Sequence, residues 1–160
     1  VDLVPVLETV VAPYVKALPP GVTLNLETEP VPPVRGDRRL LERAIVNLLE
    51  NALQAVADRG AITIRLRHAR EAGRVEVEVE DSGPGVLPEI RDRVFEPFFS
   101  TKTSGSGLGL ALVKKTLEDH GGGVSLDTRP GLTRALLWLP AAEKEGLKAP
   151  LAEAPLTPRS

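Results

Sequence analysis

Residues 74–85 read RVEVEVEDSGPG. Valine alternates with glutamate here, which predicts a strand with one face buried and the other in solvent. The alternation ends at Asp81, and Gly83 and Gly85 follow it. A carboxylate in this place can accept a hydrogen bond from an amino group of a ligand, and the glycines let the backbone approach a flat ring. An ordinary turn uses the same residue types. The stretch therefore predicts the strand and leaves the role of its end open.

The segments on either side of this strand predict the rest of the fold. Alternating apolar residues predict strands at residues 22–28, 62–67, 124–128 and 133–139. Apolar residues at helical spacing predict helices at residues 2–17, from Asp37 to a stop at Arg59-Gly60, and at residues 108–119. In the first helix, Pro13 predicts a bend or an end. Strand pairs interleaved with helices indicate an α+β fold, a two-layer sandwich with one mixed sheet under one helical layer.

The composition narrows the possible classes of function. The chain has 160 residues, 42% of them hydrophobic and 26% charged, as in an ordinary soluble domain. A net charge of −2 gives no electrostatic case for nucleic acid or anionic lipid. The chain contains no cysteine, and no apolar run reaches the roughly 20 residues that span a bilayer. It starts at Val1 without any methionine, so we expect a piece of a longer protein.

Two asparagines lie four residues apart in the long predicted helix, at Asn47 and Asn51. This spacing puts both amides on one helix face, beside the apolar stripe. Asparagine is a mediocre helix former, and its amide oxygen suits magnesium, which prefers oxygen ligands. The pair could bind a metal–phosphate group, or it could be the polar flank of an ordinary helix.

A third cluster, TKTSGSGLGLA, occupies residues 101–111. Its glycines Gly105, Gly107 and Gly109 run into a predicted helix, where backbone N–H groups can converge on an anion. Lys102 adds a mobile positive charge. The alternative is a flexible loop that leads into a helix. No Gly-Lys-Ser/Thr follows the glycines and no strong strand precedes them, so the cluster matches neither the Walker nor the Rossmann pattern.

All three phenylalanines lie between the glycine clusters, in Phe95-Glu-Pro-Phe-Phe99, and predict a hydrophobic anchor. In this order, the motifs resemble the N, first glycine, F and second glycine boxes of sensor histidine kinases, in the ATPase superfamily shared with gyrase and MutL. The resemblance covers about residues 1–140. It implies a Bergerat-type ATP-binding fold, with a mostly antiparallel sheet of about five strands under about three helices. Residues 86–106 would form the ATP lid, and residues 141–160 a disordered tail or linker.

The resemblance also implies ATP and Mg²⁺ as cofactors. Asp81 would bind the adenine amine, in a base pocket shaped by Gly83 and Gly85. Asn51 would hold magnesium, and Asn47 would contact phosphate or its water shell. The other residues assigned to the nucleotide lie around its phosphates or, for Thr133, in the water network behind the base: Lys102, Gly105, Gly107, Leu108, Gly109 and Thr133.

Some positions depart from the family pattern. Gln54 and Ser100 stand where many relatives carry a basic residue, so we expect Lys102 to be the main cation at the phosphates, as in a subgroup that looks like nitrogen-regulation and sporulation kinases. Asn47 stands where gyrase and MutL relatives carry a glutamate that activates water. Glu50 lies about 100° round the helix from Asn51, so we assign no general base. Phosphoryl transfer to a protein is expected over rapid hydrolysis.

The family's acceptor histidine lies in a helical hairpin before this domain. Here only His68 and His120 exist. We expect His120 to cap a helix end and neither residue to be the acceptor. The expected partners are the protein's own dimerisation and phosphoacceptor domain and, indirectly, a response regulator, in the cytoplasm. We expect no nucleic-acid partner and no membrane-embedded segment in this domain. The fragment alone is expected to be a monomer, and the full-length protein a homodimer.

Two other functions remain open as alternatives to the histidine kinase. They are an anti-sigma-type serine kinase and an ATP-sensing module without transfer activity.

Overall fold

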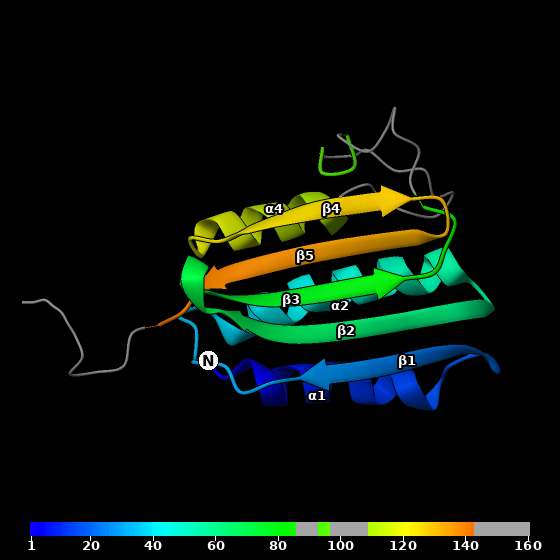
Figure 1. Cartoon of the computed structure of the whole chain (residues 1–160), viewed down its shortest axis with the longest axis horizontal. Coiled ribbons are helices and arrows are strands. Elements are labelled where there is room, and N and C mark those ends of the chain that lie inside the picture. Colours follow the sequence, from blue (N-terminus) through cyan, green and yellow to red (C-terminus); the bar gives the residue numbers. More distant parts are fainter. Residues whose placement is uncertain (86–92, 97–108, 143–160) are drawn as a thin grey trace, which may run out of the picture.

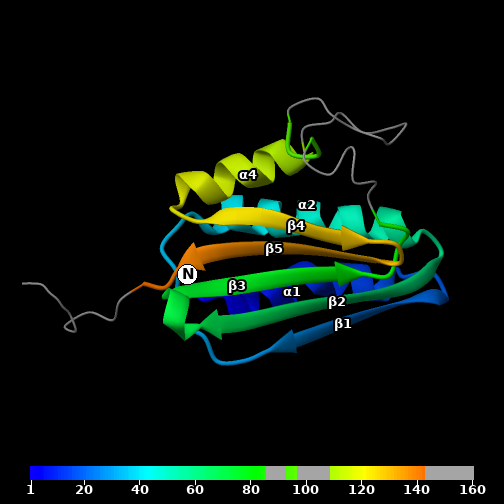
Figure 2. The same ribbon diagram turned by 45° about the horizontal axis from the view of Figure 1, so that its top comes forward.

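The computed structural model describes residues 1–85, 93–96 and 109–142. In these ranges, three α-helices lie on one face of a five-stranded sheet, and the other face is open (Figures 1 and 2). The predicted α+β two-layer sandwich is confirmed. The elements in chain order are α1 (Leu3–Lys16), β1 (Gly21–Thr28), α2 (Arg38–Val56), β2 (Arg59–Ala69), the 3₁₀ turn η1 (Arg70–Ala72), β3 (Arg74–Asp81), α4 (Gly109–Asp119), β4 (Gly123–Arg129) and β5 (Leu132–Pro140).

The sheet is mixed, with the strand order β1-β2-β3-β5-β4. β1 and β2 run parallel, because α2 crosses between them, and every other neighbouring pair is antiparallel. β3 is the central strand. Its last residue, Asp81, lies opposite Ile62 of β2 and opposite Thr133 of β5. The topology therefore places Asp81 and Thr133, two of the predicted site residues, side by side at one end of the strands.

The hydrophobic patterns place the core between the sheet and the helices. In β3, Val75, Val77 and Val79 are buried and face the helical layer. α2 buries a broad stripe against them, which includes Leu48 and Ala52. The N-caps also follow from the sequence, because Asp2 accepts a hydrogen bond from the Val4 N–H, and Asp37 accepts two, from Arg39 and Leu40.

The predicted end of the long helix was wrong by three residues. α2 ends at Val56, and Ala57 takes a positive φ of 58°. Arg59 and Gly60, which were expected to stop the helix, are the first residues of β2. The first helix has the predicted extent, because α1 runs from Leu3 to Lys16, and Pro13 does not end it.

The open face of the sheet is charged, and many of its charges form ion pairs across strands. Arg65 of β2 forms ion pairs with Glu78 at 2.8 Å and Glu80 at 3.0 Å in β3, and with Glu27 at 3.1 Å in β1. Arg134 of β5 reaches Glu80 from the other side, at 3.0 Å. These contacts link four of the five strands, so most of the charges on β1, β2, β3 and β5 are satisfied within the sheet.

The first and the last described residues of the chain lie at the end of the sheet opposite to Asp81 (Figure 1). The amino group of Val1 donates to the Val34 carbonyl at 2.7 Å, and Val34 forms a β-bridge with Ala141. The Ala142 N–H donates to the Pro33 carbonyl at 2.8 Å. Backbone pairing thus continues two residues past the boundary expected at residue 140. Within the described ranges, no helix has the length and apolar character needed to cross a membrane.

Candidate functional site

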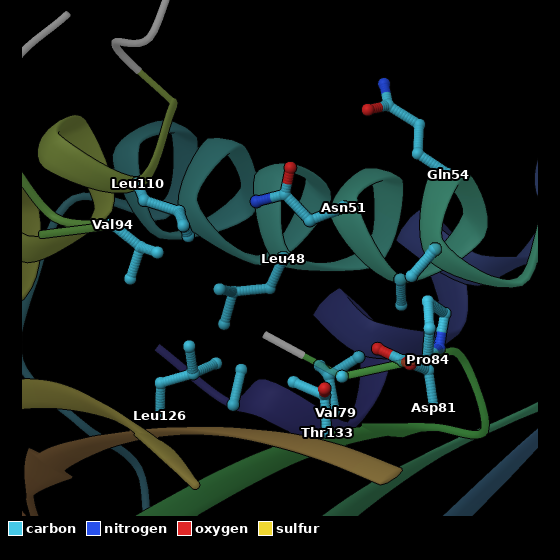
Figure 3. Close-up of a pocket in the computed structure, with 14 residues that line it drawn as sticks. Leu48, Asn51, Gln54, Val79, Asp81, Pro84, Val94, Leu110, Leu126 and Thr133 are labelled. Carbon is cyan, nitrogen blue, oxygen red and sulfur yellow. The ribbon is translucent and has the colours of Figure 1, made fainter. Parts of the chain in front are cut away.

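A cavity of about 350 Å³ opens between α2 and the end of the sheet that carries Asp81 (Figure 3). α2 forms one wall, and β3, β4 and β5 form the opposite wall. Val94 and the first turn of α4 complete the lining. The cavity is lined by Leu48, Asn51, Ala52, Gln54, Ala55, Val79, Asp81, Pro84, Gly85, Val94, Leu110, Leu126, Thr133 and Ala135. Most of these side chains are apolar, and few polar groups converge among them, as is usual for a small-molecule site.

Asp81 is the only buried polar side chain among the described residues, with 5% of its surface exposed. It continues the alternation of Val75, Val77 and Val79, so it points toward the helices from the end of the buried stripe. Burial raises the pKa of its carboxyl group. A 2.9 Å hydrogen bond from the Gly83 N–H to Oδ1 opposes that rise, and the negative charge of Glu80 adds to it. Burial of an ionised carboxylate lowers the stability of the fold, and the protein nevertheless places one at the cavity wall.

The turn after Asp81 packs against the end of α2. A Cβ at Gly83 would lie 2.9 Å from the Ala55 Cβ, so no larger side chain fits without movement. Gly85 has a φ of +87°, and a Cβ there would collide with the Arg129 carbonyl. These contacts explain why glycine is needed at both positions. They fit the predicted role of the two glycines in shaping a pocket, and that role stays a prediction.

Ser82 helps to hold the turn after Asp81 in place, a role that the sequence analysis did not predict. Its Oγ accepts a hydrogen bond from the Ala61 N–H at 2.9 Å, and its own N–H donates to the Ala61 carbonyl at 3.1 Å. Ser82 thereby holds the turn to the start of β2. The only signal in the sequence is a hydroxyl residue between Asp81 and Gly83, which is common in turns without such a bond.

The two helix asparagines are placed differently. Asn51 lines the cavity, together with Gln54 at the next turn of α2. Figure 3 shows the Gln54 side chain directed away from Asp81. Asn47 is partly exposed on α2 and is not among the lining residues. Its predicted contact with phosphate stays a prediction, as does the predicted role of Asn51 at a metal ion.

Thr133 lies beside Asp81, because the two residues are paired across β3 and β5. Its Oγ1 is 3.0 Å from the Oγ1 of Thr128 in β4, and it lines the cavity. The apolar wall includes Val94, Leu110 and Leu126, which the sequence analysis did not assign to the site. Apolar residues in or near regular elements carry no signal that separates a pocket wall from the core.

Glu50, the carboxylate next to Asn51, is bound elsewhere. It accepts a 2.8 Å hydrogen bond from the hydroxyl of Tyr14 in α1, and it does not line the cavity. Burial and, secondarily, this hydrogen bond raise the pKa of Tyr14 to about 12. The orientation supports the expectation that Glu50 is poorly aimed to act as a general base.

Several predicted site residues lie outside the described ranges. They belong to the expected lid and the glycine loop: Lys102, Gly105, Gly107 and Leu108. Ser100, Phe98 and Phe99 also lie outside, whereas Phe95 is described and partly buried. Gly109, the last glycine of the loop, is the first residue of α4. Its neighbour Leu110 lines the cavity, so α4 begins at the site.

The two histidines lie away from this cavity. His68 belongs to β2, where its backbone N–H donates to Glu29. His120 follows α4, and its Nδ1 lies 2.7 Å from the carbonyl of Thr116 in the last turn. The predicted role of His120 as a helix cap is confirmed.

A family model of "Histidine kinase-, DNA gyrase B-, and HSP90-like ATPase" matches residues 36–143, which is more than half of the chain. The chain is 40% identical over 126 residues to the sensory histidine kinase/phosphatase NtrB of Rhodobacter capsulatus, covering 72% of the chain and 36% of NtrB. It is 38% identical over 135 residues to the nitrogen regulation protein NtrY of Azorhizobium caulinodans, covering 81% of the chain and 17% of NtrY. The chain thus spans well under half of these relatives.

Solved structures show the same likeness. The mycobacterial sensor histidine kinase MprB superposes with a TM-score of 0.78 at 32% identity, covering 90% of this chain and 97% of that one. Full-length ShkA in complex with AMPPNP superposes with a TM-score of 0.76 at 30% identity, covering 90% of this chain and 31% of ShkA. The chain belongs to the family of histidine kinase-, DNA gyrase B- and HSP90-like ATPases, and within it is homologous to sensor histidine kinases that include nitrogen-regulation proteins.

Proposed function

We propose that this chain is the catalytic domain of a two-component histidine kinase, which binds ATP in the cavity and donates its γ-phosphoryl group to a histidine. The observation that carries the proposal is the buried Asp81 carboxylate at the cavity wall, with Asn51 on the opposite wall. The two groups could meet the two ends of one nucleotide. The AMPPNP bound to the homologous ShkA supports the choice of ligand.

Asp81 serves the base end of the nucleotide. A carboxylate accepts hydrogen bonds only, so it fits the exocyclic amine of adenine and opposes a carbonyl at the same position. Its one described hydrogen-bond donor is the Gly83 N–H on Oδ1, and this leaves acceptor capacity for a ligand. Thr133 lies beside it across the β3–β5 pair, with a hydroxyl that can bind the base or a water behind it.

Asn51 serves the phosphate end. Among the described residues, no cluster of three or more histidine, cysteine, aspartate or glutamate side chains could hold a metal ion unaided. Mg²⁺ commonly binds through one or two protein oxygens together with phosphate oxygens and water, so an amide oxygen on the cavity wall fits this donor set. When bound, magnesium would neutralise charge on the phosphates. Lys102 in the lid and the glycines at 105, 107 and 109 of the glycine loop would surround the phosphates.

Transfer is favoured over hydrolysis by what lines the cavity. Asp81 is its only carboxylate in the part of the chain that is described, and we assign it to the base. Glu50 is hydrogen-bonded to Tyr14, and Asn47 cannot act as a general base. The domain would act by positioning. A nitrogen of the acceptor histidine forms a bond to the γ-phosphorus, and the bond from phosphorus to the β–γ bridging oxygen breaks, so that ADP leaves.

The acceptor would come from the dimerisation and phosphoacceptor domain of the same kinase, in the cytoplasm. A response regulator would then take the phosphoryl group. The chain alone would be monomeric, and the whole kinase homodimeric. No observation favours the serine-kinase or sensing alternatives, since the relatives reported above are sensor histidine kinases and a nitrogen regulation protein.

The test combines this chain with a separate dimerisation and phosphoacceptor fragment of its kinase, Mg²⁺ and ATP labelled at the γ-phosphate. We expect label on the acceptor histidine, and none on a fragment in which that histidine is replaced by glutamine. Calorimetry on the same samples measures ATP binding. Binding without any transfer of label would contradict the kinase assignment, and no binding would contradict the nucleotide site itself.

A further inference from the structure

α4 connects the nucleotide cavity to a contact at the far end of the helix. Its first turn reaches the cavity through Leu110, and its last residue precedes His120. The helix has 11 residues and is therefore about 16 Å long. Between its ends, Val113 and Leu117 are fully buried in the core. Apolar contacts of this kind are not directional, so they define the position of α4 along α2 less sharply than a hydrogen bond does.

The ring of His120 supplies a directional contact. Nδ1 lies 2.7 Å from the Thr116 carbonyl in its own helix, and Nε2 accepts a 3.1 Å hydrogen bond from the backbone N–H of Asp37. Asp37 is the N-cap of α2. A carbonyl accepts and an N–H donates, so both bonds form only when the ring is neutral with its proton on Nδ1. One imidazole thus joins the end of α4 to the beginning of α2, across 83 positions of the sequence.

The place of this ring is defined from two sides. On one side, Gly121 has a φ of +79°, and the N–H groups of Gly121 and Gly122 donate to the carbonyls of Glu118 and Leu117, which ends α4 in a Schellman motif. On the other side, a Cβ at Gly36 would lie 2.8 Å from Nε2, so the ring fills the space next to Gly36. The imidazole is therefore bounded by the end of α4 on one side and by Gly36 on the other.

We propose that His120 is a positioning residue for nucleotide binding. Its bond to Asp37 fixes α4, whose first turn lines the cavity, relative to α2, which carries Asn51. The effect is indirect, because the ring lies at the opposite end of α4 from the cavity. The proposal rests on the nucleotide-binding function proposed above, and it adds a remote residue on which the shape of that site depends.

Two substitutions separate this role from simple helix capping. In His120→Asn, the amide replaces Nδ1 and can still bond the Thr116 carbonyl, but it is too short to reach Asp37. In His120→Gln, the longer side chain can place its carbonyl oxygen near the position of Nε2 and accept from the Asp37 N–H. The affinity for AMPPNP with Mg²⁺ is measured by calorimetry on the full chain, for the wild type, both variants and His120→Ala.

We expect affinity to fall about fivefold in His120→Asn and His120→Ala, the factor that corresponds to one hydrogen bond, and to stay within twofold of wild type in His120→Gln. Hydrogen exchange should show the Asp37 amide protected in the wild type and His120→Gln only. Nitrogen-15 shifts should show the wild-type proton on Nδ1. All measurements are made at a temperature where circular dichroism shows every variant folded.

Unchanged affinity in His120→Ala, or wild-type affinity in His120→Asn with loss in His120→Gln, would overturn the proposal. A proton on Nε2 would do the same. These outcomes differ from failure of the proposed function, in which the wild type itself does not bind the nucleotide. Gly36→Ala gives an independent check, because its methyl group would displace the ring, and it should weaken binding to the same extent as His120→Ala.

Discussion

Glu80 and Asp81 are adjacent carboxylates in β3, and they lie in opposite electrostatic environments. Glu80 points to the open face of the sheet, where Arg65 and Arg134 each approach to 3.0 Å. Asp81 points to the helical face, where no cationic side chain in the described part of the chain pairs with it. Partial burial would raise the pKa of Glu80, but the two arginines outweigh it and lower that pKa. The pKa of Asp81 is raised.

The difference separates a structural acid from a binding acid. A half-buried carboxylate between two arginines gains modest stability by pairing across strands. A buried carboxylate without a cation destabilises the fold, so its presence indicates another use. Strand geometry makes the two roles compatible at consecutive positions, since neighbouring side chains point to opposite faces.

The largest expected effect comes from Asp81→Asn. The amide keeps the shape and can still accept from the Gly83 N–H, but its NH₂ group cannot accept from the adenine amine and it carries no charge. Hydrogen bonds to charged groups contribute about 1.5–3 kcal/mol, so we expect affinity for ATP to fall by about 10- to 100-fold, as measured by calorimetry. The melting temperature should stay the same or rise, because a costly buried charge is removed. Unchanged affinity would remove Asp81 from the site.

Protonation of Asp81 should weaken binding in the same way. Its raised pKa means that the folded protein holds this proton at a higher pH than the unfolded chain does. The ionised carboxylate therefore costs stability at neutral pH, and this cost disappears as pH falls below the unfolded value. A ligand amine favours the ionised form, so ATP should lower the pKa of Asp81. Carbon-13 NMR of the carboxyl group, followed against pH with and without ATP, measures this pKa. A higher pKa in the presence of ATP would contradict the prediction.

Gly83→Ala tests the packing of the turn on which Asp81 depends. The added methyl group would lie 2.9 Å from the Ala55 Cβ, so either the turn or the end of α2 must move. Overpacking of this kind costs about 1–3 kcal/mol. We expect ATP affinity to fall roughly tenfold in the calorimeter, together with a lower melting temperature. Gly73→Ala is the matched control, because no atom lies within 4 Å of a Cβ there. Its φ of +65° disfavours alanine, so we expect some loss of stability. We expect unchanged ATP affinity, because residue 73 lies at the opposite end of β3 from Asp81.

Glu80→Gln should have the smallest effect, and on stability alone. Exposed and half-exposed ion pairs contribute about 0.2–1 kcal/mol each, so we expect about 1 kcal/mol of lost stability in urea unfolding at pH 7 and unchanged ATP affinity. The lowered pKa of Glu80 means that its contribution is present above the unfolded pKa and is lost as pH falls through the folded value. A marked loss of ATP binding in this variant would erase the distinction between the two carboxylates.

The sequence alone predicted the parts of the site that depend on local patterns. The alternation over residues 75–80 predicted a strand that ends at Asp81, and the helical stripe of α2 placed Asn51 beside the core. The chain order of the four motifs then indicated the family. These features follow from periodicity and turn chemistry, which act over a few residues.

Contacts between distant segments could not be predicted in this way. Tyr14 and Glu50 are 36 positions apart, and Asp37 and His120 are 83 apart. No local pattern indicates that these groups meet, because the pairing depends on how the helices pack on the sheet. The end of α2 was also missed, since Ala57 adopts a positive φ that alanine rarely takes.

The most direct test of the account compares ATP and GTP analogues on the wild-type chain with Mg²⁺. Adenine presents an amine where guanine presents a carbonyl, and the Asp81 carboxylate can only accept. We predict that AMPPNP binds at least about 30-fold more tightly than GMPPNP in calorimetry, since the guanine carbonyl would leave a buried charge opposed and unpaired. Equal affinity for the two analogues would contradict the claim that Asp81 reads the base.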